Sequence, residues 1–381
     1  MTPKRKGVKL QSERTFRNWL NGFRARYLNE LDPKRVDDFL FLVRFLPDIL
    51  QKYKNQAEFS LSLSDYINRV CTEDRLSLGQ KRYDEWSKPL KEIEKTYGVQ
   101  APILMSIWGI ETYYGQIRGD YQVFSALSTL AFDGRRRTFF ETELFAAIKI
   151  ADQYNVPSKT LTGSWAGAMG HMQFMPTTYQ EHAIDFDRDG FADIWSENPI
   201  DALASTAAYL AYHGWDGSLP WGHKVTLPKS FEYELTAPKL QKPVSYWEYL
   251  GLSGLPEDKH AMGSIIVPNG VSGPAFWVSG NFDVLKIYNK AISYVLSVGL
   301  LSQGLKTGEY LQLDWPRETR PLKRSEMQLL QKRLSDIGCD TKGCDGFFGP
   351  NTEFAIRRFQ KKNGLIADGY PGPNLLARLG L

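Results

Sequence analysis

Apolar residues recur at helical spacing along most of the chain. Between residues 12 and 100 they alternate with charged positions, as around Phe16 and Trp19 and again around Trp86 and Leu90. This period indicates amphipathic helices. The same pattern predicts helices over residues 101–114, 121–132, 138–154, 198–213 and 281–300.

Two stretches lack the helical pattern. Residues 217–275 are rich in proline and glycine, which predicts short strands and turns in a small mixed subdomain that covers substrate. Residues 306–321 are polar and interrupted by proline, as in a linker. We therefore expect a mainly α protein with one large domain at residues 12–305 and a compact helical domain at residues 322–381.

One acidic residue lies on an apolar helical face. Glu111 follows Leu104 by seven positions, Ile107 by four and Trp108 by three, so the four side chains share one face. Burial disfavours the charged form of a carboxyl group, and a carboxylic acid that is neutral near physiological pH can act as a general acid. The segment alone is equally compatible with a buried glutamate that is paired with an arginine or a backbone group.

A glycine-rich segment provides a second polar cluster. Gly163, Gly167 and Gly170 allow close approach of the backbone, and Gln173 offers both a hydrogen-bond donor and an acceptor. The segment is typical of the wall of a binding groove, although a helix-packing turn would use the same glycines.

A third cluster has the spacing of an EF-hand-type calcium loop, at residues 185–201. Acidic residues occupy loop positions 1, 3, 5 and 9 and Gly190 occupies position 6, but position 12 is Ser196 instead of the usual glutamate. The sequence predicts a structural Ca²⁺ site of modest affinity, with a solvated acidic turn as the alternative. The candidate ligands are Asp185, Asp187, Asp189, Phe191 and Asp201, with Glu197 as the alternative to Asp201 for the last position.

Composition narrows the choice of function. The 381 residues are 42% hydrophobic and 24% charged with a net charge of +4, which is ordinary for a globular protein and gives no indication of nucleic-acid binding. No apolar run reaches the roughly 18 residues of a membrane span, and no phosphate-binding loop, dinucleotide fingerprint or metalloprotease histidine pair occurs. We expect no organic cofactor.

Three cysteines bear on the compartment. Cys339 and Cys344 lie five positions apart in a turn-like stretch, whereas Cys71 is isolated. We expect a disulfide between the first two, which would indicate an oxidising compartment, with two free thiols as the alternative.

In their order along the chain, these clusters resemble the membrane-bound lytic transglycosylase B family of bacterial murein-degrading enzymes. The resemblance covers about residues 14–303. Residues 322–381 separately resemble the type 1 peptidoglycan-binding domain. The stretches that carry the two resemblances are residues 106–115, 166–176, 185–201 and 281–294, and then 345–352, 355–360 and 363–369.

The resemblance implies a lysozyme-like helical catalytic domain with a small mixed subdomain, followed by a three-helix binding domain. It also implies cleavage of the β-1,4 bond between N-acetylmuramic acid and N-acetylglucosamine in peptidoglycan glycan strands, with formation of 1,6-anhydro ends. Glu111 would be the single general acid and base. Ordinary glycosidases use two carboxylates, and the sequence offers no convincing second one.

The family pattern further implies a set of groove residues. Arg136 and Arg137 match a family arginine pair that would contact peptide carboxylates or pair internally. His171 and Met172 depart from the residues common in the family before Gln173. The implied groove residues are Ser164, Gln173, Tyr288, Asn289 and Tyr294.

Two other functions stay open at this point. A hydrolytic muramidase would need a second acid near Glu111, and a non-catalytic peptidoglycan-binding scaffold would need no buried acid. The substrate and the expected disulfide predict a periplasmic location, and we expect a monomer. The basic N-terminus lacks a hydrophobic stretch, so we expect that a signal or lipid anchor for the outer membrane is missing from this chain.

Overall fold

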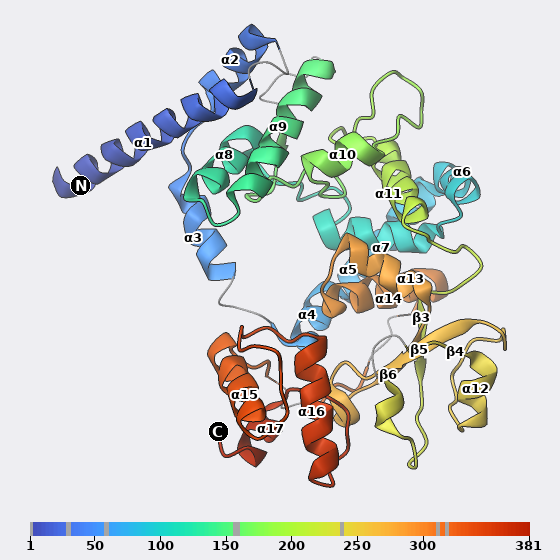
Figure 1. Ribbon diagram of the computed structural model, residues 1–381. Coiled ribbons are helices and arrows are strands. Elements are labelled where there is room, and N and C mark those ends of the chain that lie inside the picture. Colours follow the sequence, from blue (N-terminus) through green and yellow to red (C-terminus); the bar gives the residue numbers. More distant parts are fainter. Residues whose placement is uncertain are drawn as a thin grey trace. The chain divides into compact units, whose positions relative to one another are not determined.

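The computed structural model describes most of the chain and divides into two compact units (Figure 1). The first unit comprises residues 1–57, 81–97 and 107–209, and the second comprises residues 58–80, 98–106 and 210–381. The described residues are 3–27, 32–56, 61–154, 161–236, 240–309, 313–316 and 320–381.

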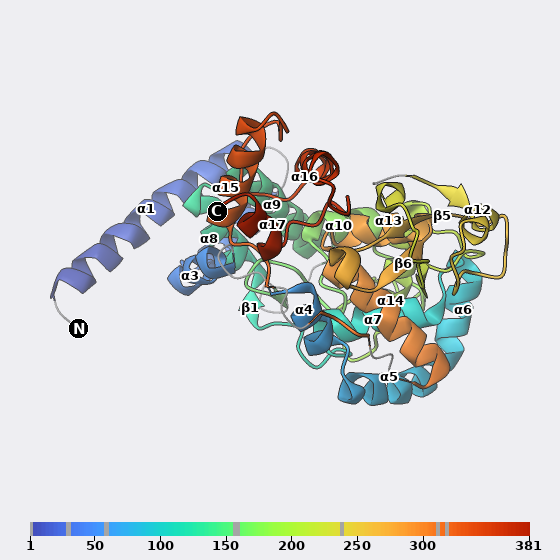
Figure 2. The same cartoon turned by 90° about the horizontal axis from the view of Figure 1, so that it is seen from below.

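The first unit is helical. Its helices α8 (Val123–Asp133) and α9 (Arg137–Gln153) pack side by side (Figures 1 and 2). Helix α8 is buried along residues 123–131 because its sequence is apolar nearly all round, and it ends at Gly134, which has a positive φ of 89°. The remaining elements of this unit are α1 (Pro3–Tyr27), α2 (Pro33–Leu42), α3 (Pro47–Gln56), α6 (Ser87–Tyr97), α10 (Pro176–His182) and the short pair β1 (Tyr121–Gln122) and β2 (Thr162–Gly163).

Three helices pass from one unit to the other, namely α5 (Glu73–Glu85), α7 (Ala101–Thr112) and α11 (Ile200–Tyr212). The second unit also contains α4 (Leu63–Val70), which packs against α14 (Ile292–Thr307).

The predicted mixed subdomain is an antiparallel four-stranded sheet of order β3-β6-β5-β4. Its core contains Trp247, Ile265 and Trp277, which are fully buried. The sheet confirms the short strands expected from the proline- and glycine-rich stretch. The elements are β3 (Gly222–Val225), η1 (Tyr233–Thr236), β4 (Lys242–Pro243), α12 (Val244–Tyr249), β5 (Met262–Ile266), η2 (Gly270–Ser272) and β6 (Ala275–Val278).

The helix expected over residues 281–300 is broken in two. Helix α13 (Gly280–Tyr288) and helix α14 are bent by 116°. Asn289 leaves the helix with extended backbone, and its side-chain oxygen accepts a hydrogen bond from the Ala291 N–H at 3.1 Å. Competition of the asparagine side chain with the helix explains the break, which the apolar periodicity does not reveal.

The C-terminal domain contains α15 (Arg324–Asp336), α16 (Pro350–Lys362) and α17 (Pro373–Arg378), drawn in red in Figures 1 and 2. Its core includes Leu330, Leu334, Ile356 and Leu376. The mainly α class with a three-helix C-terminal domain is therefore confirmed. Of the expected linker, residues 306 and 307 belong to α14, and residues 310–312 and 317–319 lie outside the described residues.

Helix α16 is docked on the sheet subdomain through one arginine. The Arg357 guanidinium donates to the Tyr233 carbonyl at 2.7 Å and to the Thr236 hydroxyl at 2.9 Å, while it pairs with Glu353 at 2.8 Å. Only 11% of the Arg357 side chain is exposed. The charge is thus desolvated but fully paired, as a buried ion pair requires.

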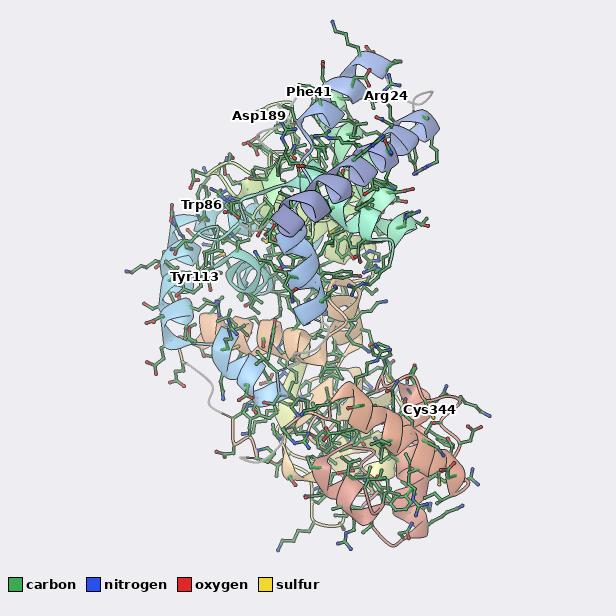
Figure 3. All side chains as sticks on the ribbon, turned by 90° about the vertical axis from the view of Figure 1, so that its left-hand side faces the viewer. Arg24, Phe41, Trp86, Tyr113, Asp189 and Cys344 are labelled. Carbon is green, nitrogen blue, oxygen red and sulfur yellow. The ribbon has the colours of Figure 1, made fainter. Side chains whose placement is uncertain are left out.

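The expected disulfide between Cys339 and Cys344 is not formed. Cys339 is buried in the apolar core of the C-terminal domain, whereas Cys344 is exposed on its surface (Figure 3). The turn between them is held instead by Thr341, whose hydroxyl donates to the Gly343 carbonyl at 2.7 Å. Within that core the thiol of Cys339 packs as a small apolar group.

No single helix within the described ranges is long and apolar enough for a membrane span, and only the bent pair α13 and α14 meets that test when taken together.

Candidate active site

Glu111 lies in the last turn of a buried apolar helix. In α7 the residues from Ile103 to Gly109 are buried, and Glu111 is half-buried. The helix stops because Tyr113 and Tyr114 have φ angles of 53° and 57°, in the left-handed region. Glu111 therefore follows buried apolar residues of the helix, while its own side chain stays partly exposed and can contact a ligand.

The loop residue His171 contacts the helix end on several sides of Glu111. Its Nδ1 accepts from the Trp108 indole N–H at 3.0 Å, and its carbonyl accepts from the Thr112 hydroxyl at 2.7 Å. The ring packs so closely on Gly115 that a Cβ there would lie 2.5 Å from it. His171 therefore fixes the turn that carries Glu111.

The hydrogen-bond network assigns the tautomer of this histidine. Because Trp108 can only donate, Nδ1 of His171 is unprotonated and the neutral ring carries its proton on Nε2, which donates to the Ser196 carbonyl at 2.7 Å. Burial lowers the pKa of His171, and the charge of Arg118 acts in the same direction. Arg118 also donates to the Ser196 carbonyl, at 2.8 Å, and pairs with Glu197.

The segment after Glu111 lies directly against the glycine-rich segment. Strands β1 and β2 pair antiparallel, with Tyr121 opposite Gly163. Gly119 approaches the Gly163 carbonyl so closely that a Cβ at position 119 would lie 2.2 Å from its oxygen. The segment predicted to form a groove wall is thus adjacent in space to the segment that follows Glu111.

Ser164 and Gln173 are both half-buried and both shape this wall. The Ser164 hydroxyl accepts from the Ala168 N–H at 3.1 Å. The Gln173 amide donates to the carbonyls of Arg118 at 3.1 Å and Gly170 at 3.0 Å, and Gln173 has a φ of 52°. Its strained backbone and bound amide hold the side chain in one place.

A buried carboxylate supports the next helix. Glu143 of α9 accepts from the Thr177 N–H at 3.0 Å and from its hydroxyl at 2.8 Å, at the start of α10. Burial raises the pKa of Glu143, and the two bonds from Thr177 oppose that rise. This acid is a structural cap of α10.

Three of the expected groove residues lie in the second unit, at the break between α13 and α14. Tyr288 is the last residue of α13, Asn289 forms the break, and Tyr294 is in the first turn of α14. The rings of Tyr288 and Tyr294 stack at 6.2 Å with an interplanar angle of 11°. The break therefore brings together residues that a continuous helix would separate.

Arg136 and Arg137 are exposed at the start of α9. The Arg136 guanidinium lies 4.0 Å from the centre of the Phe139 ring, in a cation–π contact. Neighbouring Arg135 pairs with Asp133 at 3.0 Å. The arginine pair was expected either to contact peptide carboxylates or to pair within the protein. Arg136 contacts an aromatic ring of its own chain.

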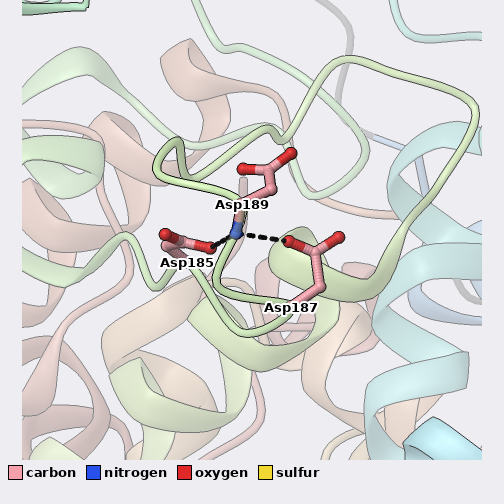
Figure 4. A group of neighbouring side chains, drawn as sticks. All are labelled: Asp185, Asp187 and Asp189. Carbon is pink, nitrogen blue, oxygen red and sulfur yellow. Dashed lines mark hydrogen bonds between the residues drawn. The ribbon is translucent and has the colours of Figure 1, made fainter.

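The acidic loop gathers three carboxylates, shown in Figure 4. One oxygen of each of Asp185, Asp187 and Asp189 lies within 4.8 Å of the others. Gly190 has a positive φ of 99° at the position where an EF-hand turns sharply. Ca²⁺ prefers carboxylate and carbonyl oxygens as ligands. The three carboxylates, together with the backbone carbonyl of Phe191, would supply such oxygens.

Asp201, the expected last ligand, is not part of that group of three. Its two oxygens accept from the N–H groups of Phe186 and Asp193, both at 2.9 Å. Burial raises the pKa of Asp201, and the two backbone bonds oppose that rise. Asp201 therefore ties the two arms of the loop together.

The network of Trp108, His171 and Arg118 was not predicted from the sequence. Trp108 and His171 are 63 residues apart, and no local pattern pairs an indole with a distant histidine. The one available signal was a histidine among glycines on a segment already expected to line the groove.

Family models match both parts of the chain. Residues 15–303 match the transglycosylase SLT domain, and residues 323–379 match the putative peptidoglycan binding domain.

Several known proteins are similar over most of the chain. The membrane-bound lytic murein transglycosylase B of Escherichia coli is 28% identical over 291 residues, which cover 72% of this chain and 78% of the relative. SltB3 from Pseudomonas aeruginosa, solved in complex with NAG-anhNAM-pentapeptide and with NAG-NAM-pentapeptide, is 39% identical with a TM-score of 0.91 and covers 96% of this chain and 99% of its own. Escherichia coli Slt35 in complex with calcium is 26% identical with a TM-score of 0.66, over 76% and 93% of the two chains.

The length of the matched region and the similarity to SltB3 establish the family and its lysozyme-like helical fold. The chain belongs to the transglycosylase SLT-domain family and is a peptidoglycan lytic transglycosylase with a C-terminal peptidoglycan-binding domain.

Proposed function

We propose that Glu111 is the single general acid and base of this enzyme. As an acid it protonates the glycosidic oxygen between N-acetylmuramic acid and N-acetylglucosamine. As a base it then takes the proton from the muramyl 6-hydroxyl, whose oxygen attacks C1 of the same sugar and closes the 1,6-anhydro ring. The observation that carries this proposal is the position of Glu111, half-buried in the last turn of an apolar helix that His171 holds in place.

The other buried acids support a scheme with one carboxylate. Among the described residues, the carboxylates buried below one tenth exposure are those of Glu141, Glu143 and Asp201. Glu141 pairs with Arg26 at 2.7 Å, and the other two accept from backbone groups. A hydrolase would need a second acid that activates water, and these three are already committed to structural roles.

We propose that Ser164, Gln173, Tyr288, Asn289 and Tyr294 line the glycan groove. Their hydroxyl and amide groups suit the N-acetyl and hydroxyl groups of the sugars. Arg137, exposed at the start of α9, would meet peptide carboxylates, with Arg136 held beside it by Phe139.

The products of cleavage test the mechanism. Purified peptidoglycan sacculi incubated with the enzyme should release muropeptides with 1,6-anhydromuramic ends, detected by mass spectrometry. Glu111→Gln should lower turnover by about 10²–10⁴-fold, the usual contribution of general acid–base catalysis, while binding to sacculi persists. Glu141→Gln is the matched control, because it neutralises a buried acid of the same unit that pairs with Arg26.

Other products would identify the alternatives. Reducing ends would establish a hydrolytic muramidase with a second acid. Binding to sacculi without release of fragments would establish a non-catalytic scaffold. Wild-type turnover by the Glu111→Gln variant would mean that Glu111 is not the catalytic residue.

We propose that the acidic loop holds a structural Ca²⁺ through Asp185, Asp187, Asp189 and the Phe191 carbonyl. Bound there, the ion would neutralise the three carboxylates and fix the loop, and it would take no part in the chemistry. Asp201 remains a candidate for the last position. Its bonds to Phe186 and Asp193 show that it already reaches both arms of the loop.

We also propose a domain division and a location. The catalytic domain would span residues 12–305, the linker 306–321 and the wall-binding domain 322–381. Since peptidoglycan lies outside the cytoplasmic membrane, we propose that the enzyme acts in the periplasm. We also propose that it is a monomer and that an N-terminal lipid anchor attaches it to the outer membrane, which membrane fractionation would test.

A further inference from the structure

The C-terminal domain contains the same loop twice. The first copy runs from Asp345 to Asn351 and the second from Asp368 to Asn374; both read Asp-Gly-aromatic-x-Gly-Pro-Asn. In each copy the proline begins a helix, which is α16 for the first and α17 for the second. The two glycines that follow the aspartates have φ angles of 78° and 74°.

A buried glutamine holds each copy in the same way. Gln331 donates to Oδ1 of Asp345 at 2.9 Å and accepts from the Gly346 N–H at 2.8 Å. Gln360 donates to Oδ1 of Asp368 at 2.7 Å and accepts from the Gly369 N–H at 2.9 Å.

The aspartates share a second feature. Oδ1 of each also accepts from the N–H two residues on, at 2.9 Å from Phe347 and at 3.0 Å from Tyr370. The two loops are therefore structural equivalents, and each leaves Oδ2 of its aspartate for another partner.

The second copy shows what such a loop binds. Oδ2 of Asp368 accepts from the backbone N–H of Val271 at 2.9 Å. The residue before that donor is Gly270, with a φ of 66°. An L-side chain there would place its Cβ 2.5 Å from Oδ2 of Asp368 and 2.8 Å from Cβ of Tyr370. The loop thus recognises a peptide N–H that follows a residue with positive φ and no L-side chain.

The first copy presents the same acceptor to solvent. Asp345 is exposed, and the described residues provide no partner for its Oδ2. The bond from the Phe347 N–H, followed by that from Gln331, lowers the pKa of the Asp345 carboxyl group below its usual value. Phe347 and Phe348 beside it are 61% and 46% exposed, and Phe348 lines a cavity of about 380 Å³.

We propose that the Asp345 loop binds the stem peptide of peptidoglycan, with Oδ2 of Asp345 accepting the backbone N–H that follows a D-residue. D-residues favour positive φ, the mirror image of the L preference, and their Cβ points away from the position where an L-Cβ would clash. Stem peptides contain D-residues, and they therefore reproduce the feature that Gly270 supplies to the second copy. The proposal rests on the assignment of peptidoglycan as the substrate of this chain.

Binding of the full chain to sacculi tests the loop, in the Glu111→Gln background so that the wall is not degraded. Asp345→Asn retains an Oδ1 for both local bonds but replaces the charged Oδ2 acceptor with an amide, and it should weaken binding about tenfold, the size of one hydrogen bond to a charged group. Asp340→Asn is the matched control, since it removes an exposed charge that pairs with Lys342 in the same turn. Equal affinity of the two variants would overturn the proposal.

A second measurement does not depend on any variant. A soluble stem pentapeptide with its natural D-residues should shift the amide resonances of Gly346 and Phe347 in the isotope-labelled full chain, and an all-L peptide of the same composition should not. Absence of a shift, or equal shifts with both peptides, would contradict the proposal. Failure of the substrate assignment itself would appear separately, as a lack of any muropeptide release by the wild-type enzyme.

Discussion

At the scale of single residues, the helix end that carries Glu111 is bound by a side chain from a distant part of the sequence. Trp108, Thr112 and Gly115 surround Glu111 along the chain, and all three contact His171. A neutral imidazole suits this position because it accepts on one edge and donates on the other. We therefore propose that His171 is a positioning residue that acts through the helix end.

We predict that His171→Phe lowers kcat about 10²-fold and leaves KM nearly unchanged, because small misplacements of an acid are costly to the chemical step. The phenyl ring keeps the bulk but leaves the Trp108 N–H and the Ser196 carbonyl without this partner. His171→Gln, which can both donate and accept, should recover part of the loss. Steady-state turnover of soluble glycan fragments gives both constants.

His182→Phe is the control for this variant, since it makes the same change at a histidine on α10 that packs on Tyr209. If both variants lose kcat equally, or if His171→Phe alters only KM, then His171 has no positioning role.

Residue-scale features were predictable where they depend on local spacing. The sequence spacing of Glu111 from Leu104, Ile107 and Trp108 predicted the helix that carries all four residues. The alternate positions of the three aspartates predicted that their carboxylates lie together in the acidic loop. The contact between Trp108 and His171 depends on tertiary folding, which no single spacing encodes. The predicted disulfide was wrong because proximity in sequence does not determine that one cysteine faces the core and the other faces solvent.

At the scale of elements, the acidic loop concentrates negative charge. Asp185, Asp187 and Asp189 place oxygens within 4.8 Å of one another, and like charges at that distance repel. A cation bound only by the folded chain would remove the repulsion and stabilise the fold.

Calcium should therefore raise the melting temperature by several degrees, since a ligand at about 100 times its Kd contributes about 2.7 kcal/mol. Thermal unfolding with millimolar Ca²⁺ and with a chelator measures the shift. Asp187→Asn should reduce the shift, whereas Asp283→Asn, an exposed acid of α13 paired with Lys286, should not. An unchanged melting curve would mean that the loop is a solvated acidic turn and binds no Ca²⁺.

Element boundaries followed the apolar pattern where helices are regular. Helices α7, α8, α9 and α11 occur where the periodicity predicts them. The bend after Tyr288 was missed because Asn289 interrupts the backbone without interrupting the pattern of apolar positions. The stacked pair Tyr288 and Tyr294 is a direct product of that bend.

At the scale of the whole molecule, the mainly α class with a small three-helix C-terminal domain was predicted, but the docking of the C-terminal helices on the sheet was not. That docking uses the largely buried pair Arg357 and Glu353, whose side chains are 11% and 18% exposed, together with carbonyl and hydroxyl groups of η1. Removal of one partner from a buried ion pair typically costs about 3–5 kcal/mol.

Arg357→Met should release the C-terminal domain and produce a separate, earlier melting transition in calorimetry. Arg358→Met, an exposed arginine at the next position of α16, should retain the wild-type profile. A single unchanged transition in the Arg357 variant would mean that the remaining contacts, such as that between Asp368 and Val271, suffice for docking.

Docking of the C-terminal domain determines how many of its two duplicated loops can bind the wall. While the C-terminal domain is docked, the Asp368 loop is occupied by Val271 of the same chain, and only the Asp345 loop is open to the wall. Release of the domain would expose both loops, and two linked sites on one polymer bind with avidity that exceeds either affinity alone. Under the proposal for the Asp345 loop, docking keeps the enzyme monovalent at its wall-binding end, and a single stem contact can be released and remade as the glycan strand is degraded.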